Sequence, residues 1–405
     1  MAAFQNETLG ERVAELRRRR GLSQRELAVE VGRSESWVSQ VERDVLPVER
    51  VSVLQSLAEA LGVAVRDIRP EPSTVEPPLS AENQLASLRL ALTGHPALGT
   101  LLGTSESQVA DLDLLKTDVE EAWRLTHASE FSALAGLLVP LLSSLESTAR
   151  QVRGRQRTRV AQLLSSAYQA AAAAFARQGE ADAAWLAADR ATRWAEDGGD
   201  PLAAAAGGFR MGHAFLTLRR ADQAEYVATT AITALQPLTA RPDCPPEALS
   251  LYGAMHLLLA VVHAREGNRT ATHDVIGKAR KIAARLGDDR NDYNTEFGPT
   301  NVELHAVSTA VDLGDAGEAV DLGRAIDASN LSPERQARLC IDLARAHVQR
   351  RHIGEAVAAL LEAEHLAPEQ VQTHSLVRTA VNDLLGLAGR RATPDLLNLA
   401  RRIGV

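Results

Sequence analysis

The chain has 405 residues, enough for roughly two to four domains with a substantial buried core. Aromatic residues make up only 3% of the sequence and hydrophobic residues 45%, so the core must be built from Ala, Leu and Val, which favours closely packed helices over a large sheet. The net charge of -8 argues against a protein that coats nucleic acid by bulk positive charge, and two widely separated cysteines exclude a disulfide framework or a thiolate zinc site.

Residues 1–70 carry the start and stop signals of four or five short helices. Ser23 and Glu26 form a capping box that opens one helix, and Gly32 can end that helix in the left-handed conformation. Ser34 can then cap the helix that follows. This segment predicts a small helical domain.

Residues 71–80 are rich in proline and predict a linker, because proline cannot continue a helix. From 81 to 405 the pattern is helical throughout, and a short motif recurs at turns between helices. Its five copies end at Ala184, Ala224, Ala271, Ala319 and Ala356. Their separations of 40, 47, 48 and 37 residues predict a solenoid of two-helix repeats, although they exceed the ~34 residues of a tetratricopeptide repeat. The fold class we expect is all-α, with a helical-repeat, tetratricopeptide-like body.

The stretch LSQRELAVEVGRSESWVSQVERD, residues 22–44, predicts two short helices joined by a tight turn, as in a helix-turn-helix. It closely resembles the Cro/C1-type (xenobiotic-response-element type) DNA-binding domain, and the resemblance covers residues 9–68. The resemblance implies a lambda-repressor-like fold for residues 1–70 and binding to double-stranded DNA.

The same resemblance implies which side chains contact DNA. They are Gln24, Arg33, Ser34, Glu35, Ser36, Trp37, Ser39, Gln40 and Arg43. Glu35, Ser36, Ser39 and Gln40 occupy base-facing positions, while Gln24 corresponds to a glutamine that contacts phosphate and braces the recognition helix. The chemistry is suitable, since Gln can pair with adenine and Glu can accept from cytosine.

Three features of this segment leave alternatives open. Trp37 could pack at the edge of the domain instead of contacting DNA, and the run Arg17 to Arg20 could be a solvated helix end or a phosphate contact. Glu42 is expected to pair with an arginine of the first helix, such as Arg12. Because residues 1–70 hold eleven Arg and eleven acidic residues, one copy should bind DNA weakly, so we expect a homodimer on an inverted-repeat operator.

The whole chain is similar to actinobacterial transcriptional regulators with a tetratricopeptide-like C-terminal domain, through segments such as FRMGHAFL and DYNTEFGPTNVELH. Its architecture is more distantly similar to that of the peptide-sensing regulators of Gram-positive bacteria. The resemblance implies that the body binds an effector, either a small molecule or a peptide. The alternative is a scaffold that recruits a protein partner to DNA without a small effector.

Six polar residues of the body are candidates for effector binding: Arg210, His213, His256, Asn294, Asn301 and His305. Asn301 and His305 share one helix face, as do Arg210 and His213. The competing interpretation is that they cap helices or form hydrogen bonds between helices.

The sequence has no signature of an enzyme, a cofactor site or a metal site: we find no Gly-x-Ser-x-Gly, Gly-x-Gly-x-x-Gly, phosphate loop or His-Glu-x-x-His. Glu7 and Glu11 stand where a signal peptide would need an apolar stretch, and the apolar runs of the chain fall well short of the roughly 18 residues of a membrane span. We therefore expect a cytoplasmic regulator without catalysis, cofactor or membrane partner.

Overall fold

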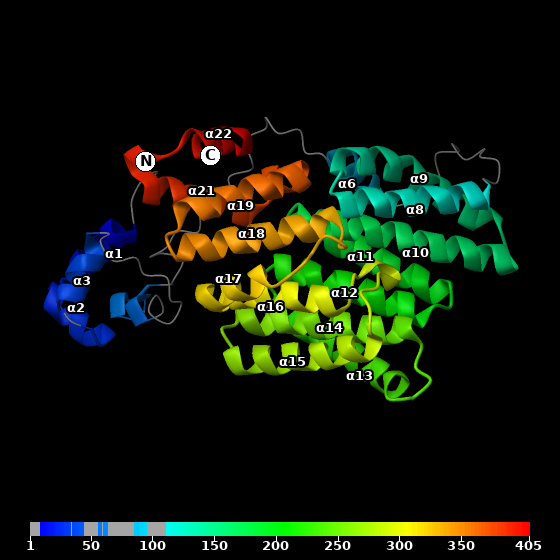
Figure 1. The fold of residues 1–405 in the computed structure, drawn as a ribbon, viewed down its shortest axis with the longest axis horizontal. Helices are drawn as coiled ribbons and strands as arrows, with labels where there is room; N and C mark the ends of the chain where they lie inside the picture. Colours follow the sequence, from blue (N-terminus) through cyan, green and yellow to red (C-terminus); the bar gives the residue numbers. More distant parts are fainter. Residues whose placement is uncertain (1–8, 34, 44–55, 59, 64–84, 95–110) are drawn as a thin grey trace. The chain divides into compact units, whose positions relative to one another are not determined.

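The computed structural model describes residues 9–33, 35–43, 56–58, 60–63, 85–94 and 111–405 (Figure 1). The chain divides into two compact units, Met1–Glu82 and Asn83–Val405. Both are built of helices, and within the described ranges the only β pairing is an isolated bridge between Arg290 and Phe297. The all-α prediction is confirmed. The predicted linker, 71–80, and Ser34 lie outside the described residues.

The N-terminal unit contains α1 (Leu9–Arg19), α2 (Gln24–Val31) and α3 (Glu35–Glu42). The capping box at Ser23 and Glu26 is present, with the Ser23 hydroxyl accepting from the Glu26 main chain. Gly32 ends α2 with φ 68°, a conformation that costs glycine little. The apolar positions of the three helices form one core, which includes Val13, Leu27, Val38 and Val41.

The second unit is a stack of antiparallel helix pairs. After α6 (Ala86–Thr93), the pairs are α8 (Leu112–Ala128) with α9 (Phe131–Gln151), α10 (Gly154–Arg177) with α11 (Ala181–Asp197), α12 (Pro201–Thr217) with α13 (Ala221–Thr239), α14 (Pro246–Arg265) with α15 (Arg269–Leu286), α16 (Pro299–Leu313) with α17 (Ala316–Arg324), and α18 (Pro333–Gln349) with α19 (Ile353–Leu366). The chain ends with α20 (Pro368–Thr373), α21 (Ser375–Ala388) and α22 (Pro394–Ile403). Two 3-10 turns, η1 (Asp292–Asn294) and η2 (Gly389–Arg391), complete the described elements.

The recurring alanine marks the first turn of the second helix in five of these pairs. Ala184, Ala224, Ala319 and Ala356 are fully buried there, because a small side chain lets the two helices approach closely. In the fourth pair Ala271 is half-buried, and the next residue, Thr272, takes the buried position. The recurring motif did not predict the pair α8 and α9, where the corresponding buried residue is Leu134.

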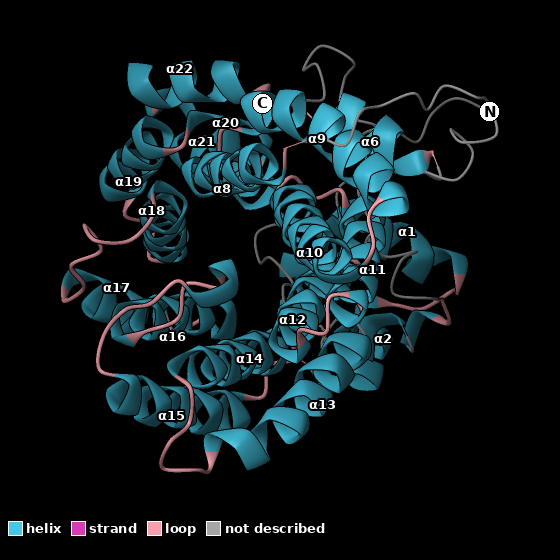
Figure 2. Cartoon of the chain, turned by 90° about the vertical axis from the view of Figure 1, so that its right-hand side faces the viewer, coloured by secondary structure: helices cyan, strands magenta, loops and turns pink. Residues whose placement is uncertain are grey.

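The helix pairs are arranged as a ring around a central axis (Figure 2). The first helix of each pair, from α8 to α18, forms the inner wall, and the second helix forms the outer wall. The ring closes where α8 contacts α18. At this seam the Ser129 hydroxyl donates to the Gln370 side chain (2.8 Å), and the Ser132 main chain donates to Glu369 (3.0 Å).

Two of these helices, α9 and α14, are long and apolar enough to cross a membrane by length and composition alone. Both are packed into the ring instead. In α14, 78% of the apolar window is buried, as expected for a core helix that neighbours cover on several sides.

Candidate functional site

The residues that α3 buries in the core determine which of its residues face solvent. Val38 and Val41 are buried in the core, which places Glu35 and Arg43 on the exposed side, with Ser39 and Gln40 partly exposed. The tight turn before α3 is held by the Arg33 main chain, which donates to the carbonyl of Ala28 (2.8 Å). The second helix of the pair therefore presents a short polar surface to solvent.

A buried ion pair fixes α3 against the first two helices. Arg17 donates from Nη2 to one oxygen of Glu42 (2.9 Å) and from Nε to the other, and Gln24 Nε2 donates to Glu42 as well (2.7 Å). Burial opposes ionisation of Glu42, but the hydrogen bonds from Arg17 and Gln24 outweigh it and hold the Glu42 pKa below its ordinary value. The prediction that Glu42 pairs with an arginine of the first helix is confirmed, but that arginine is Arg17; Arg12, the example named, contacts Glu15 (3.5 Å).

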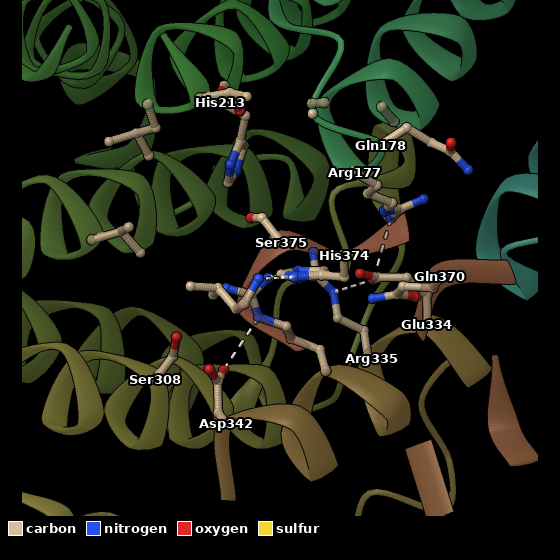
Figure 3. Close-up of a pocket in the computed structure, with 18 of the residues that line it drawn as sticks. Arg177, Gln178, His213, Ser308, Glu334, Arg335, Asp342, Gln370, His374 and Ser375 are labelled. Carbon is tan, nitrogen blue, oxygen red and sulfur yellow. Dashed lines mark hydrogen bonds and ion pairs between the residues drawn. The ribbon is translucent and has the colours of Figure 1, made fainter. Parts of the chain in front are cut away.

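The second unit contains a cavity of about 450 Å³ between the inner-wall helices and the start of α21 (Figure 3). His213 points into it from α12, and His374 lies on the facing wall. The lining contains far more charge than the alanine-rich helices around it. The polar lining residues include Arg177, Arg210, His213, Arg265, Asn301, His305, Asp312, Glu334, Arg335, Arg338, Asp342 and His374.

Two networks of ion pairs account for most of this charge. In the first, Glu334 contacts Arg177 (3.3 Å) and Arg335 (3.6 Å), while Arg335 also contacts Glu296 (3.2 Å). Burial disfavours the charged form of Glu296, but the hydrogen bond from His127 and the charge of Arg335 together lower its pKa far below the ordinary range.

In the second network, Asp342 contacts Arg338 (3.2 Å) and Arg345 (2.8 Å), and Arg345 also reaches Asp312 (2.6 Å). The two networks together contain four arginines and four carboxylates, so they balance. Neither leaves a charge for a ligand to neutralise.

Arg210 belongs to neither network. Its Nη2 donates to the main-chain oxygen of Asn294 (2.5 Å), and its guanidinium carbon lies 5.0 Å from the centroid of the Trp123 ring. Its Nε is buried without a hydrogen-bond partner. Burial, together with the nearby positive charges of Arg177 and Arg335, lowers the Arg210 pKa to about 9.

The loop that holds Arg210 is strained. Three of its non-glycine residues have positive φ angles: Tyr293 at 48°, Asn294 at 57° and Glu296 at 51°. The loop is tied down by the Tyr293 hydroxyl, which donates to Asp200 (3.1 Å), and by the Glu296 pairs with His127 and Arg335. Such strain persists only where surrounding contacts fix the backbone, and it is concentrated at functional sites.

The histidines of the cavity are neutral near pH 7. Burial lowers the pKa of His305 to about 4 and that of His374 to about 3, and it lowers the His213 pKa well below its ordinary value. His305 donates from Nδ1 to the main-chain oxygen of Asn301 (2.9 Å), which leaves its Nε2 as an acceptor. The cavity thus offers neutral hydrogen-bonding groups beside its cations.

Comparison with known proteins identifies the first unit. Residues 8–70 match the model of a family described as a helix-turn-helix domain. The N-terminal unit is a helix-turn-helix DNA-binding domain. The two helices of the motif are α2 and α3.

A solved structure, PlcR of Bacillus thuringiensis in complex with the peptide PapR7 and DNA, is 15% identical over 69% of this chain and 96% of that chain. The TM-score is 0.30, a similarity that says nothing about what this chain binds. A comparison with curated proteins returned no significant match.

The structure places the predicted DNA contacts of the helix-turn-helix domain as follows. Gln24 braces α3 through Glu42, and Trp37 packs half-buried against the core with the Arg33 guanidinium carbon 5.7 Å from its ring centroid. Arg43 is exposed and donates to the Ser39 main chain. Ser34 and the side chain of Ser36 lie outside the described residues.

Four of the six predicted effector residues line the cavity: Arg210, His213, Asn301 and His305. His256 does not. It is buried within α14, with Nδ1 donating to the Tyr252 main chain (2.9 Å). Asn294 is also outside the lining, but its main chain holds Arg210.

The charged face of α18 was not predicted from the sequence. Its residues Glu334, Arg335, Arg338, Asp342 and Arg345 all belong to the two ion-pair networks. Their separations of three and four residues place them on one side of a helix, a signal that the sequence did contain.

Proposed function

We propose that this protein is a homodimeric, sequence-specific transcription regulator of the cytoplasm, whose helix-turn-helix domain reads an inverted-repeat operator in double-stranded DNA. The observation that carries the proposal is the family match of residues 8–70 together with the polar outward face of α3. The helical-repeat body dimerises and binds an effector in its cavity. The effector, a small molecule or a peptide, modulates operator binding.

The side chains on α3 read the bases. Glu35, Ser36, Ser39 and Gln40 follow one another along the first two turns of the helix, the part that enters the major groove in this class of domain. Arg33, Ser34 and Arg43 contact the backbone at the two ends of α3. Gln24 acts chiefly by orienting α3 through Glu42, and Trp37 by packing beside Arg33.

An effector can change operator affinity only if it binds one arrangement of the dimer better than another. The ring provides a suitable element, because its cavity lies between helices that are far apart in the sequence, α10 and α21 among them. A ligand that contacts both would bias how the ring closes. A change in how the ring closes then alters how well the two helix-turn-helix domains of the dimer match the two half-sites of the operator.

The test is selection of genomic DNA fragments by the purified full-length protein, followed by sequencing. We compare the natural chain with a Glu35→Ala, Gln40→Ala variant and with Arg193→Gln, a matched control on the exposed face of α11. We expect a few sites that share an inverted repeat in the natural chain and the control. Each lost base contact should cost ~1 to 3 kcal/mol at its own position.

Equal enrichment by the Glu35→Ala, Gln40→Ala variant would refute the assignment of α3, and absence of enriched sites in all three proteins would refute sequence-specific binding. Sedimentation of the full chain tests the dimer. A monomer alone, with and without the selected DNA, would refute that part of the proposal.

A further inference from the structure

Two arginines of the cavity lining, Arg210 and Arg265, lie outside the two ion-pair networks. The two ion-pair networks are neutral as described above, and Arg210 and Arg265 have no carboxylate partner among the described residues. Arg265 donates from Nη1 to the main-chain oxygen of Leu216 (3.0 Å) and is exposed to solvent. Asp312 and Asp342 act on it electrostatically, but no ion pair joins either of them to it among the described residues. Both arginines line the cavity, so each offers a guanidinium group to a ligand there.

Two uncharged polar residues, His213 and Asn301, line the same cavity as these two arginines. Arg210 lies on α12, and Arg265 binds α12 six residues further along, at Leu216, which is about 9 Å along a helix axis. His213 lies on α12 between Arg210 and Leu216, and burial together with the charges of Arg210 and Arg265 lowers its pKa. Asn301 faces the same cavity with its side-chain oxygen buried and unpaired.

Arg210 is buried, and a buried guanidinium without an ion-pair partner is unfavourable, because burial removes its hydration. An anionic ligand supplies that counterion. Arg265 is exposed and keeps its hydration, so it can pair with a second acidic group at low cost. Guanidinium groups match carboxylate and phosphate oxygens in geometry, which makes arginine well suited to hold them. The volume of about 450 Å³ is in the range of small-molecule sites and is compact for a peptide.

We propose that the cavity of the helical-repeat body binds a compact organic molecule with two acidic groups, one paired with Arg210 and the other with Arg265. The inference rests on the proposed effector function and narrows its ligand to one chemical class. His213 and Asn301 contact the uncharged part of the molecule between the two acidic groups. The balanced networks of α18 form the rest of the wall and take no ligand charge.

The test is binding of defined probes to the full-length protein by calorimetry and by the shift in melting temperature. The probes are the dicarboxylates oxalate, succinate, glutarate and adipate, and inorganic pyrophosphate, at constant ionic strength. Acetate at twice the concentration and the diamide of succinate are the controls for charge alone and for shape alone. A comparison of the dicarboxylates with pyrophosphate shows whether the cavity prefers carboxylate or phosphate groups.

We expect saturable binding of at least one dianion, at least tenfold tighter than acetate. Arg210→Met and Arg265→Met should each weaken it at least tenfold, Arg210→Lys should retain part of it, and Arg193→Gln should bind as the natural chain does. Far-UV circular dichroism shows whether each variant is folded. Failure of every dianion to bind above the acetate control, or equal binding by Arg210→Met and Arg265→Met, would overturn the inference.

Operator binding is measured separately, by fluorescence anisotropy with a selected DNA site. A dianion that binds through both arginines without changing operator affinity supports this inference and refutes the proposed effector control. The two conclusions can therefore fail independently.

Discussion

Replacement of Arg210 by methionine tests whether its charge lacks a counterion. The pKa of Arg210 is lowered from 12.5 to about 9. At about 1.4 kcal/mol per pKa unit, the folded protein loses about 5 kcal/mol by keeping this group charged. Since pH 7 lies below both values, the group is charged in the folded and unfolded states alike, and the cost is constant up to about pH 9.

Methionine removes that cost but also loses two contacts. The hydrogen bond to the Asn294 main chain is a charged one, of about 1.5 to 3 kcal/mol, and the contact with the Trp123 ring adds about 0.5 to 2 kcal/mol. The difference predicts that Arg210→Met leaves the free energy of unfolding unchanged or raises it by up to about 3 kcal/mol. Most substitutions of buried residues do the opposite.

Urea unfolding at pH 7, followed by far-UV circular dichroism of the full chain, measures the effect. Arg193→Met is the matched control, because the Arg193 side chain is 75% exposed and its replacement should change stability by less than about 0.5 kcal/mol. Destabilisation of Arg210→Met by about 2 kcal/mol or more would refute the reasoning. It would mean that the ligand-free protein already compensates the charge.

Three further predictions concern stability. The pKa of His305 is about 4 in the folded protein and 6.5 in the unfolded chain, so the unfolded chain binds this proton first as the pH falls. The contribution of neutral His305 to the free energy of unfolding is therefore complete above pH 6.5 and is lost toward pH 4, by up to about 1.4 kcal/mol per pH unit. A melting temperature that is constant between pH 7 and 5 would contradict this. Gly253→Ala should destabilise the body by about 1 to 3 kcal/mol in urea, because its Cβ would overlap the Phe297 ring; unchanged stability would show that the ring can move. Glu42→Ala leaves Arg17 buried without its partner and should cost the N-terminal unit about 3 kcal/mol, seen as faster limited proteolysis of that unit; a proteolysis rate equal to that of the natural chain would argue against it.

The sequence was most informative where structure depends on residues close together in the chain. The capping box of Ser23 and Glu26 and the left-handed Gly32 are local arrangements, so α2 and its turn could be predicted from a few letters. The same holds for the buried alanines at the helix pairs, such as Ala184 and Ala224, whose repetition predicted the stacked body.

What could not be predicted depends on residues far apart. Ser129 and Gln370 are separated by 241 residues, and Arg177 and Glu334 by 157, yet both pairs are in contact. Whether a stack of helix pairs curves enough to bring its ends together depends on small rotations that accumulate at every interface. His256 shows the same limit, since it was a candidate for effector binding and its position in α14 buries it away from the cavity.

The seam between α8 and α18 also changes how the body should come apart. In an open solenoid each repeat touches only its neighbours, so the terminal repeats fray first and stability grows roughly in proportion to repeat number. A ring has no terminal repeat of that kind, because the first pair supports the last through Ser129, Gln370 and their neighbours. Opening it requires both faces of the seam to become hydrated at once. The body should accordingly unfold as one cooperative unit, and truncation before Pro368 should weaken its N-terminal helices as much as its C-terminal ones.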